Sequence, residues 1–283
     1  MMKIALAGYG KMGRMIEAAA VERGHQITAA VDPFARGSHT ACGAVLLPAF
    51  PPAAEGAGSP DLFIEFTHPE SAPDNIKAAA ALGKPVICGT TGWFGKLAEV
   101  SVVVEKAGTA LLWSSNFSLG VNLFYRIAAH AARLFDPFAE YDVGGTEIHH
   151  RKKADSPSGT AKTLMEQVLA AMKRKTNVLW GDLPKPDASC SGALPGSGAL
   201  PCSGALSDSA VHFASLRYGT ASGTHSLFFD SLADTVEITH TARSREGFAS
   251  GAVIAAEWLC GLENKTARRG IFTMEDVLKD ILP

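Results

Sequence analysis

The sequence predicts an α/β protein in which a parallel-sheet domain comes first and an α+β domain with a mixed sheet comes second. In the first part of the chain, short apolar runs alternate with helical stretches, as in parallel strands joined by crossover helices. After Asn116, apolar strand-like runs follow one another, which is typical of an α+β domain. The 283 residues suffice for roughly two domains of about 150 residues each.

The first domain is expected to open with a strand at Lys3–Ala7 (KIALA), which stops at Gly8. An alanine-rich helix is expected over 12–21 and a second strand over 26–32. The pattern recurs in strands within 61–67, 85–91 and 110–118 and in a helix at 69–82. Each strand stops at a cluster of Gly, Thr, Ser or Asn, and open parallel sheets bind ligands at that edge.

The second domain is expected to contain helices at 121–134 and 161–173 and a strand at 141–150. Its later strands are expected at 211–218, 224–231 and 235–242. A long apolar helix over 248–258 has no partner that the pattern alone identifies.

Composition excludes several classes of protein. The formal net charge is −2, whereas proteins that bind nucleic acid through phosphates carry a basic excess. No apolar stretch is long enough for a membrane span, and the N-terminus lacks the pattern of a secretory signal. The five cysteines are scattered and never spaced CxxC, so neither a disulfide framework nor a metal site is expected. We therefore expect a cytoplasmic enzyme without nucleic-acid or membrane partners.

A six-residue unit occurs three times in succession, as SGALPG, SGALPC and SGALSD from Ser191 onward. This unit is far too short for a solenoid repeat, and its Ser, Gly and Pro content suits an irregular surface loop. A lid over an active site is the alternative interpretation.

A glycine turn follows the first strand, with the spacing Gly8-x-Gly10-x-x-Gly13. In dinucleotide-binding turns the first glycine makes the turn, the second lets the backbone approach a pyrophosphate, and the third permits close helix–strand packing. Asp32 lies 19 residues beyond Gly13 at the end of the second strand, where a carboxylate accepts hydrogen bonds from a ribose 2′-hydroxyl. This carboxylate favours NADH, although Lys11, Arg14 and Arg36 are cations that still allow NADPH. A tight turn with a purely structural aspartate is the alternative.

Two further clusters end later strands, at the places where a nicotinamide ring is expected. They are Gly89-Thr90-Thr91 and Ser114-Ser115-Asn116-Phe117. Taken singly, either is an ordinary turn. After a dinucleotide fingerprint in a βα series, both become candidate cofactor contacts.

The segment from Glu147 to Thr160, EIHHRKKADSPSGT, contains the highest density of residues suited to catalysis or anion binding. Ser156 and Pro157 suit the N-cap and first position of a helix, which puts Ser158, Gly159 and Thr160 in its first turn. Free amides there are expected to bind a carboxylate that Lys153 also reaches, and a histidine can transfer protons near neutral pH. A solvated basic run before a capped helix is the alternative. The histidines outside this segment, His225 included, are expected at the surface or as satisfied sheet partners.

Several motifs together resemble the 4-hydroxy-tetrahydrodipicolinate reductase (dihydrodipicolinate reductase) family. They are GYGKMG, FIEFTHPE, CGTTGW, SSNFSLGVN, EIHHRKKADSPSGTA, SLRYGTASGTHSLFF, EITHTARSREGFASGA and IFTMEDVL. The resemblance spans both halves of the chain, and its histidine–lysine–PSGTA segment is the most specific part.

The resemblance implies an NADH- or NADPH-dependent enzyme of lysine and diaminopimelate biosynthesis. It implies a Rossmann-like dinucleotide-binding domain at 1–117, completed by 244–283. Residues 118–243 then bind a small cyclic dicarboxylate and form a homotetramer through their sheet, with closure between the domains. Pro33 stands after Asp32, where some members carry an arginine, and the SGALP repeat replaces a loop that often contains arginine.

Site residues follow from the same resemblance. His149 matches the proton donor or acceptor and Lys153 a second proton donor, whereas His150, Ser158, Gly159 and Thr160 match substrate contacts. The cofactor contacts expected are Gly8, Tyr9, Gly10, Lys11, Met12, Gly13, Asp32, Gly89, Thr90, Thr91, Ser114, Ser115, Asn116 and Phe117. The reaction implied is loss of water from the hydroxylated ring, hydride addition at C4 and protonation of the resulting enamine. The alternatives are another NAD(P)-dependent amino-acid or semialdehyde dehydrogenase and a non-catalytic NAD(P) sensor.

Overall fold

The computed structural model describes residues 1–35, 37–50, 59–182, 206–262 and 267–282. It divides into two compact units, the first formed by residues 1–122 and 245–283 and the second by 123–244. Arg36 and the three-copy repeat up to residue 205 lie outside the described residues. Within the described ranges, no helix combines the length and apolar character that crossing a membrane requires.

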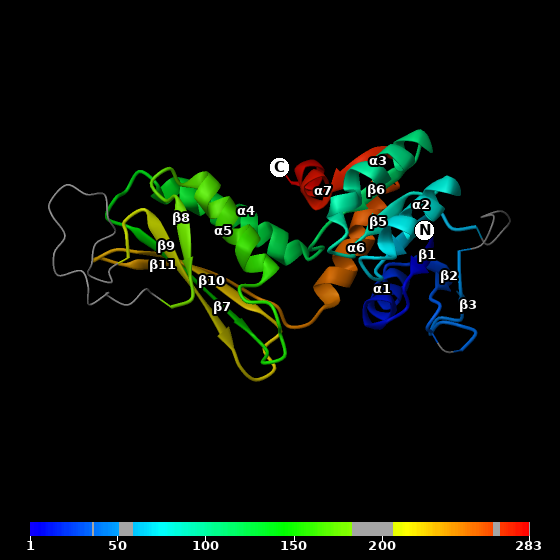
Figure 1. Ribbon diagram of the computed structural model, residues 1–283, viewed down its shortest axis with the longest axis horizontal. Helices are drawn as coiled ribbons and strands as arrows, with labels where there is room; N and C mark the ends of the chain where they lie inside the picture. The colour runs from blue at the N-terminus through cyan, green and yellow to red at the C-terminus, as the bar shows by residue number, and fades with distance from the viewer. Residues whose placement is uncertain (36, 51–58, 183–205, 263–266, 283) are drawn as a thin grey trace. The chain divides into compact units, whose positions relative to one another are not determined.

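A seven-stranded sheet with the order β12-β6-β5-β4-β1-β2-β3 forms the centre of the first unit (Figure 1). All six strand pairs are parallel, which confirms the Rossmann-like prediction. The carboxyl ends of these strands therefore share one edge, and the order reverses between β1 and β4, where such folds bind their ligands. The strands are β1 Lys3–Ala7, β2 Gln26–Val31, β3 Val45–Leu47, β4 Leu62–Glu65, β5 Val86–Cys88, β6 Ala110–Trp113 and β12 Gly270–Thr273.

Helices cover both faces of this sheet. The helices are α1 Lys11–Glu22, α2 Ala72–Ala81, the 3₁₀ turn η1 Phe94–Lys96, α3 Leu97–Lys106, α6 Glu246–Leu259 and α7 Met274–Ile281. Apolar side chains of α1, α6 and α7 form one buried cluster with the sheet, and those of α2 and α3 form another. Two cores on opposite faces explain why the central strands are apolar almost throughout.

The apolar helix without a recognisable partner is α6, which packs against α1 and the sheet of the first unit. Gly251 makes this approach possible, because a Cβ there would lie 1.8 Å from the carbonyl oxygen of Phe117. The sequence after residue 244 therefore returns to the core of the first unit.

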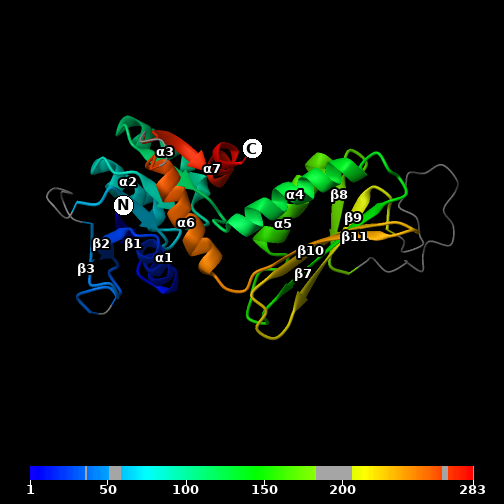
Figure 2. The same cartoon turned by 180° about the vertical axis from the view of Figure 1, so that it is seen from behind.

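The second unit is built on a five-stranded mixed sheet with the order β11-β10-β7-β9-β8. Strand β10 pairs antiparallel with β7 and β11, whereas β9 pairs parallel with β7 and β8, as the α+β prediction requires. The strands are β7 Asp142–His149, β8 Asn177–Trp180, β9 Ala210–Arg217, β10 Thr224–Asp230 and β11 Thr235–Thr241. Helices α4 (Leu119–Phe135) and α5 (Gly159–Ala171) lie along one face of the sheet, and the described residues place no helix on the other (Figures 1 and 2).

The start of α5 differs from the expectation. The N-cap is Ser158, whose hydroxyl oxygen accepts a hydrogen bond from the amide of Ala161 at 3.1 Å, and not Ser156. Both serines suit an N-cap, but only Ser158 has its amide held by a buried side chain of β7. A tertiary contact therefore decides where this helix begins.

Candidate active site

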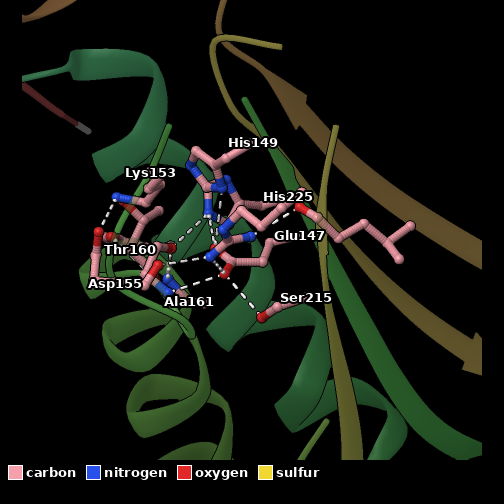
Figure 3. A network of polar contacts seen from close by, with 12 residues as sticks. Glu147, His149, Lys153, Asp155, Thr160, Ala161, Ser215 and His225 are labelled. Carbon is pink, nitrogen blue, oxygen red and sulfur yellow. Dashed lines mark hydrogen bonds and ion pairs between the residues drawn. The ribbon is translucent and has the colours of Figure 1, made fainter. Parts of the chain in front are cut away.

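Strand β7 brings Glu147 and His149 to the face of the sheet that α5 covers. Its residues alternate between buried and partly exposed, and Val143, Gly145, Glu147 and His149 are the buried ones. Glu147 is fully buried and His149 is 7% exposed. Figure 3 shows both side chains beside the first turn of α5. Such burial is costly for polar groups unless they have partners, so the contacts of Glu147 decide what this site can do.

One carboxylate oxygen of Glu147 is surrounded by hydrogen-bond donors. Oε1 accepts from the amide of Ser158 at 3.0 Å, from Oγ of Ser215 at 2.9 Å and from Nη2 of Arg217 at 2.8 Å. The pairing of β9 with β7 sets Ser215 opposite Glu147 and Arg217 opposite His149. A charged hydrogen-bond partner and two neutral ones hold this carboxylate ionised inside the protein.

The other oxygen faces two histidines. Oε2 of Glu147 lies 3.4 Å from Nδ1 of His149 and 3.3 Å from Nε2 of His225. The two imidazole rings meet edge to face, with centroids 5.1 Å apart. His225 Nε2 also lies 3.2 Å from Oγ of Ser158. The antiparallel pairing of β10 with β7 puts His225 directly opposite Glu147. His225 is thus a sheet partner, one of its two expected places, and it also belongs to this cluster, which the sequence does not indicate.

The charges of this cluster follow from burial and partners. Burial alone would raise the pKa of Glu147, but contacts with His225, Ser158 and Arg217 hold that pKa well below its usual range. Burial lowers the pKa of His149 to about 4, and the neighbouring cations add to this effect while the Glu147 carboxylate opposes it. Near neutral pH the cluster therefore holds an ionised Glu147 beside a neutral His149.

The first turn of α5 offers free backbone donors beside this cluster. The amide of Ser158 is already used by Glu147, so it is not the free donor that the sequence suggested. The amides of Gly159 and Thr160 make no hydrogen bond to the part of the chain that the structure describes. Gly159 is exposed and Thr160 partly so. These two amides, with the positive end of the helix dipole, form a place for an anion.

The basic run does not gather around one point. Arg151 and Lys152 are exposed, whereas Lys153 is partly buried and its Nζ lies 2.8 Å from Oδ1 of Asp155. His150 is partly buried, and its Nδ1 is shielded from solvent without a partner among the described residues. Lys153 and His150 are therefore the two members of the run whose side chains lie close enough to the protein to contribute to a site.

The glycine turn of the first unit has the shape that a nucleotide pyrophosphate needs. Gly8 has a φ of +92°, and a Cβ there would lie 2.3 Å from the carbonyl oxygen of Phe66. A Cβ on Gly13 would lie 2.2 Å from the carbonyl oxygen of Gly8, so this residue lets α1 approach β1. At Gly10, the N-cap of α1, nothing lies within 4 Å of an added Cβ. Two glycines thus close the turn while the third leaves open space before the amides of Lys11 and Met12.

Asp32 and Tyr9 support this turn from within. Oδ2 of Asp32 accepts a hydrogen bond from the amide of Tyr9 at 2.8 Å, and Oδ1 accepts from Phe34 and Ala35. The Tyr9 side chain is 3% exposed, and its hydroxyl binds Glu17 and the amide of Ala41. The Tyr9 side chain is therefore not available to a cofactor. Tyr9 can contribute to the expected cofactor contact only through its backbone, as part of the turn. Asp32 is partly exposed and keeps lone pairs for a further donor.

The other strand ends lie along the same edge. A Cβ on Gly89 would lie 2.1 Å from the Phe66 ring, and Oγ1 of Thr90 accepts from the amide of Thr67 at 2.8 Å. Phe117 is 1% exposed, so it belongs to the core. Five expected contact residues of these two clusters remain at least partly exposed: Gly89, Thr91, Ser114, Ser115 and Asn116.

Comparison with known families accounts for nearly the whole chain. Residues 2–117 match the family profile "Dihydrodipicolinate reductase, N-terminus", and residues 120–278 match "Dihydrodipicolinate reductase, C-terminus". The chain belongs to the dihydrodipicolinate reductase family. It is 35% identical over 280 residues to a 4-hydroxy-tetrahydrodipicolinate reductase of Christiangramia forsetii, covering 99% of each chain. It is thus an NAD(P)H-dependent oxidoreductase of lysine and diaminopimelate biosynthesis.

Solved structures share the fold. A dipicolinate-bound dihydrodipicolinate reductase from Paenisporosarcina sp. TG-14 superposes with a TM-score of 0.66 at 20% identity, with 100% of both chains covered. An amine dehydrogenase from Mycobacterium smegmatis gives a TM-score of 0.54 at 13% identity, covering 95% of this chain and 94% of that chain. The fold is therefore shared with proteins of low sequence identity.

Sequence reasoning missed three partners of Glu147 in this reductase: Ser215, Arg217 and His225. They lie 68 to 78 residues beyond Glu147, on two strands whose pairing with β7 the sequence does not reveal. The signal that points to them is the motif SLRYGTASGTHSLFF, which contains all three residues.

Glu147, His149 and His225 also present ligand atoms within 4.8 Å of one another, a donor set that suits a transition metal. The Arg217 guanidinium already supplies positive charge to the same carboxylate. A cation bound here would lie beside the positive charge of Arg217, which disfavours metal binding.

Proposed function

We propose that this protein reduces 4-hydroxy-tetrahydrodipicolinate to tetrahydrodipicolinate with loss of water, using His149 and Lys153 for proton transfer. The observation that carries the proposal is the buried Glu147–His149 pair beside the free amides of Gly159 and Thr160, in a chain of the dihydrodipicolinate reductase family. The pair can exchange a proton, and the amides can bind a carboxylate, so one site meets both requirements of a cyclic dicarboxylate substrate.

The second unit supplies the substrate contacts. The amides of Gly159 and Thr160 bind one carboxylate, and Lys153 turns from Asp155 to the same anion. His150 contributes a further polar contact from the turn after β7. We assign Ser158 to the support of Glu147 and His225 through its amide and hydroxyl, and not to direct substrate contact through its amide.

The first unit fits a dinucleotide, because its glycine turn leaves open space at Gly10 before the start of α1. Gly8 to Gly13 would hold the pyrophosphate, Asp32 the adenosine ribose, and the loops at 89–91 and 114–117 the nicotinamide end. When bound, the reduced nicotinamide supplies the hydride for C4 of the substrate ring. Asp32 favours NADH over NADPH, because its carboxylate accepts from a 2′-hydroxyl and repels a 2′-phosphate.

The protein's own groups complete the reaction. His149 gives a proton to the enamine carbon and Lys153 acts as a second proton donor. The charge that develops as hydride arrives is stabilised by Lys153 and by the first turn of α5. The substrate's two negative charges raise the proton affinity of His149, which is neutral beforehand because of its burial.

The test is a coupled assay in which a synthase makes the substrate from pyruvate and aspartate semialdehyde while the ultraviolet absorbance of NADH is followed. We expect a loss of absorbance that requires the synthase and disappears in His149→Ala, although that variant still binds NADH. Repeating the assay with NADPH measures the cofactor preference. A folded protein that binds NADH but turns over with neither nucleotide would contradict the proposed substrate.

We include assembly in the proposal: a cytoplasmic homotetramer formed through the sheet of the second unit. The sheet face opposite α4 and α5 carries Leu216, which is 50% exposed in the single chain. Sedimentation should give about four times the 29.6 kDa chain mass, and Leu216→Lys should shift the distribution to smaller species. A monomer at micromolar concentration contradicts this part.

A further inference from the structure

The two oxygens of Glu147 have different surroundings, and this difference carries an inference about His149. Oε1 has three donors, whereas Oε2 has no hydrogen bond of good geometry and faces only the nitrogens of two histidines. Glu147 is fully buried, so bulk solvent does not supply the missing donors. An ionised oxygen in that position is stable only if the nitrogens that face it carry hydrogen.

We propose that Glu147 is the positioning residue of His149: it holds the hydrogen of the neutral imidazole on Nδ1, so that Nε2 is the atom that exchanges a proton with substrate. This inference deepens the proposed function and rests on it for the role of His149. Which ring nitrogen of a histidine carries the hydrogen is set by the contact that the other one makes. The 3.4 Å contact between Nδ1 and Oε2 would be repulsive if Nδ1 were bare.

The surroundings of Nε2 agree with this assignment. No hydrogen bond from the described residues occupies Nε2, whereas Nδ1 is shielded against Glu147. Gly223 lies beside Nε2, and a Cβ there would be 3.0 Å from it. A side chain at this position would press on the nitrogen that must reach the substrate, so the glycine keeps Nε2 open.

His225 is the second element of the arrangement. Its Nε2 lies 3.3 Å from Oε2 and 3.2 Å from Oγ of Ser158. Nδ1 of His149 and Nε2 of His225 then donate to Oε2, and three donors bind Oε1. Together they keep the Glu147 carboxylate from rotating away from His149. The other charged groups near His149 are Lys153, on the turn after β7, and Arg217 on β9, and both oppose its protonation.

Proton movement follows from this geometry. With substrate bound, His149 carries a hydrogen on each ring nitrogen, and the hydrogen on Nε2 passes to the enamine carbon. The ring returns to the neutral form with its hydrogen still on Nδ1. The carboxylate of Glu147 stays ionised throughout and stabilises the imidazolium form.

The direct test is magic-angle-spinning NMR of wild-type protein labelled with ¹⁵N and ¹³C in its histidines, with His149→Asn to assign the signals. At neutral pH we expect the protonated-nitrogen shift at Nδ1 of His149 and the bare-nitrogen shift at Nε2. A hydrogen on Nε2 instead overturns the proposal. This measurement needs neither turnover nor a Glu147 variant that folds.

Kinetics of Glu147→Gln supply the second readout. We expect kcat to fall about 100-fold or more, with KM changed only a few-fold, because substrate contacts remain while the proton donor is misplaced. The limb of the pH profile that requires protonated His149 should move to lower pH, since Glu147 raises the proton affinity of His149. An unmoved limb, with His149 still carrying its hydrogen on Nδ1, overturns the positioning role.

Glu257→Gln is a matched control from the first unit. Glu257 also binds an arginine and a histidine, with Arg23 at 2.6 Å and His25 at 2.8 Å. Its loss should lower stability but leave the pH profile and the His149 signals unchanged.

If wild-type protein shows the Nδ1 hydrogen but no turnover, the proposed function fails and the positioning of His149 stands. If it turns over with the hydrogen on Nε2, the positioning role fails and the proposed function stands.

Discussion

At the scale of single residues, burial and charge compete, and the partners decide the outcome. Burial favours the neutral form of every ionisable group, yet Glu147 stays ionised because contacts with His225, Ser158 and Arg217 hold its pKa low. His149 lies in the same cluster and stays neutral near pH 7, because burial outweighs its one carboxylate neighbour. Two adjacent groups thus have opposite responses to the same environment, which suits a site that moves a proton.

His149 makes stability depend on pH. Between pH 4 and 6.5 the unfolded chain binds a proton at this residue and the folded chain does not, so the free energy of unfolding falls as pH is lowered through this window. On going from pH 7 to pH 5 this residue should cost about 2 kcal/mol. In denaturant unfolding, the His149→Gln variant should lack this pH-dependent loss of stability. His39→Gln, the control at an exposed histidine, should behave like wild type. Equal pH dependence in all three proteins contradicts the expected charge state.

Asp32→Ala tests the preference for NADH. We expect NADH affinity to fall about tenfold, because a hydrogen bond to a charged acceptor is lost, and the gap between NADH and NADPH to narrow. Asp61→Ala is the control, because Oδ2 of Asp61 also accepts from a backbone amide, that of Lys3, but at the opposite edge of the sheet. Calorimetry with both nucleotides measures the ratio. An unchanged ratio of NADH to NADPH affinity in Asp32→Ala would contradict the role of Asp32 in this preference.

Lys153→Ala tests the anion contact. Substrate binding and turnover should both fall by about tenfold or more, because an anion partner and a proton donor are lost together. Lys152→Ala, one residue earlier and exposed, should keep near-normal kinetics. Near-normal kinetics in both variants would contradict the role of Lys153 in the site and support the alternative of a solvated basic run.

At the scale of elements, close packing depends on a few small residues. α6 reaches the sheet of the first unit because Gly251 leaves room for the carbonyl of Phe117. α5 begins at Gly159 because Ser158 is fixed by Glu147 and caps the helix. Both are tertiary effects on helices that pattern alone locates to within a few residues.

Gly251→Ala should destabilise the first unit by about 2 kcal/mol, although alanine favours helix formation. The physical reason is overlap of the new methyl group with the backbone of Phe117. Ser250→Ala, one position earlier on the same helix, should be neutral or slightly stabilising. The midpoints of thermal unfolding of the two variants are compared. Equal midpoints would contradict the prediction and show that α6 can shift to make room for the methyl group at no cost.

At the scale of the whole molecule, the chain leaves the first unit and returns to it. Residues 245–283 supply α6 to one core and β12 to the edge of the parallel sheet beside β6. The first unit therefore cannot be completed before the end of the chain is available.

A chain that stops at residue 243 should lose the cooperative unfolding of the first unit and bind a hydrophobic dye, because the core that α6 covers becomes exposed. Calorimetry and dye fluorescence measure this directly. Cooperative unfolding and NADH binding that match the full chain would contradict the assignment of α6 to this core.

Much of the fold follows from local signals. The βαβ unit, the glycine turn and the run of later strands are visible as periodicity and spacing, and the structure has them where they were expected. The strands β3, β8 and β12 have only three or four residues each and were not predicted, because such short apolar runs carry little periodicity.

The sequence by itself determined the two kinds of sheet, the turn at Gly8 to Gly13 and the segment that contains His149 and Lys153, because each depends on neighbours in the chain. Only the tertiary structure decided that His225, Ser215 and Arg217 surround Glu147, since strand pairing joins residues 68 to 78 positions apart. It also decided that Ser158 caps α5 and that α6 belongs to the first core. Long-range pairing and burial set the charges of the site, and local sequence does not encode either.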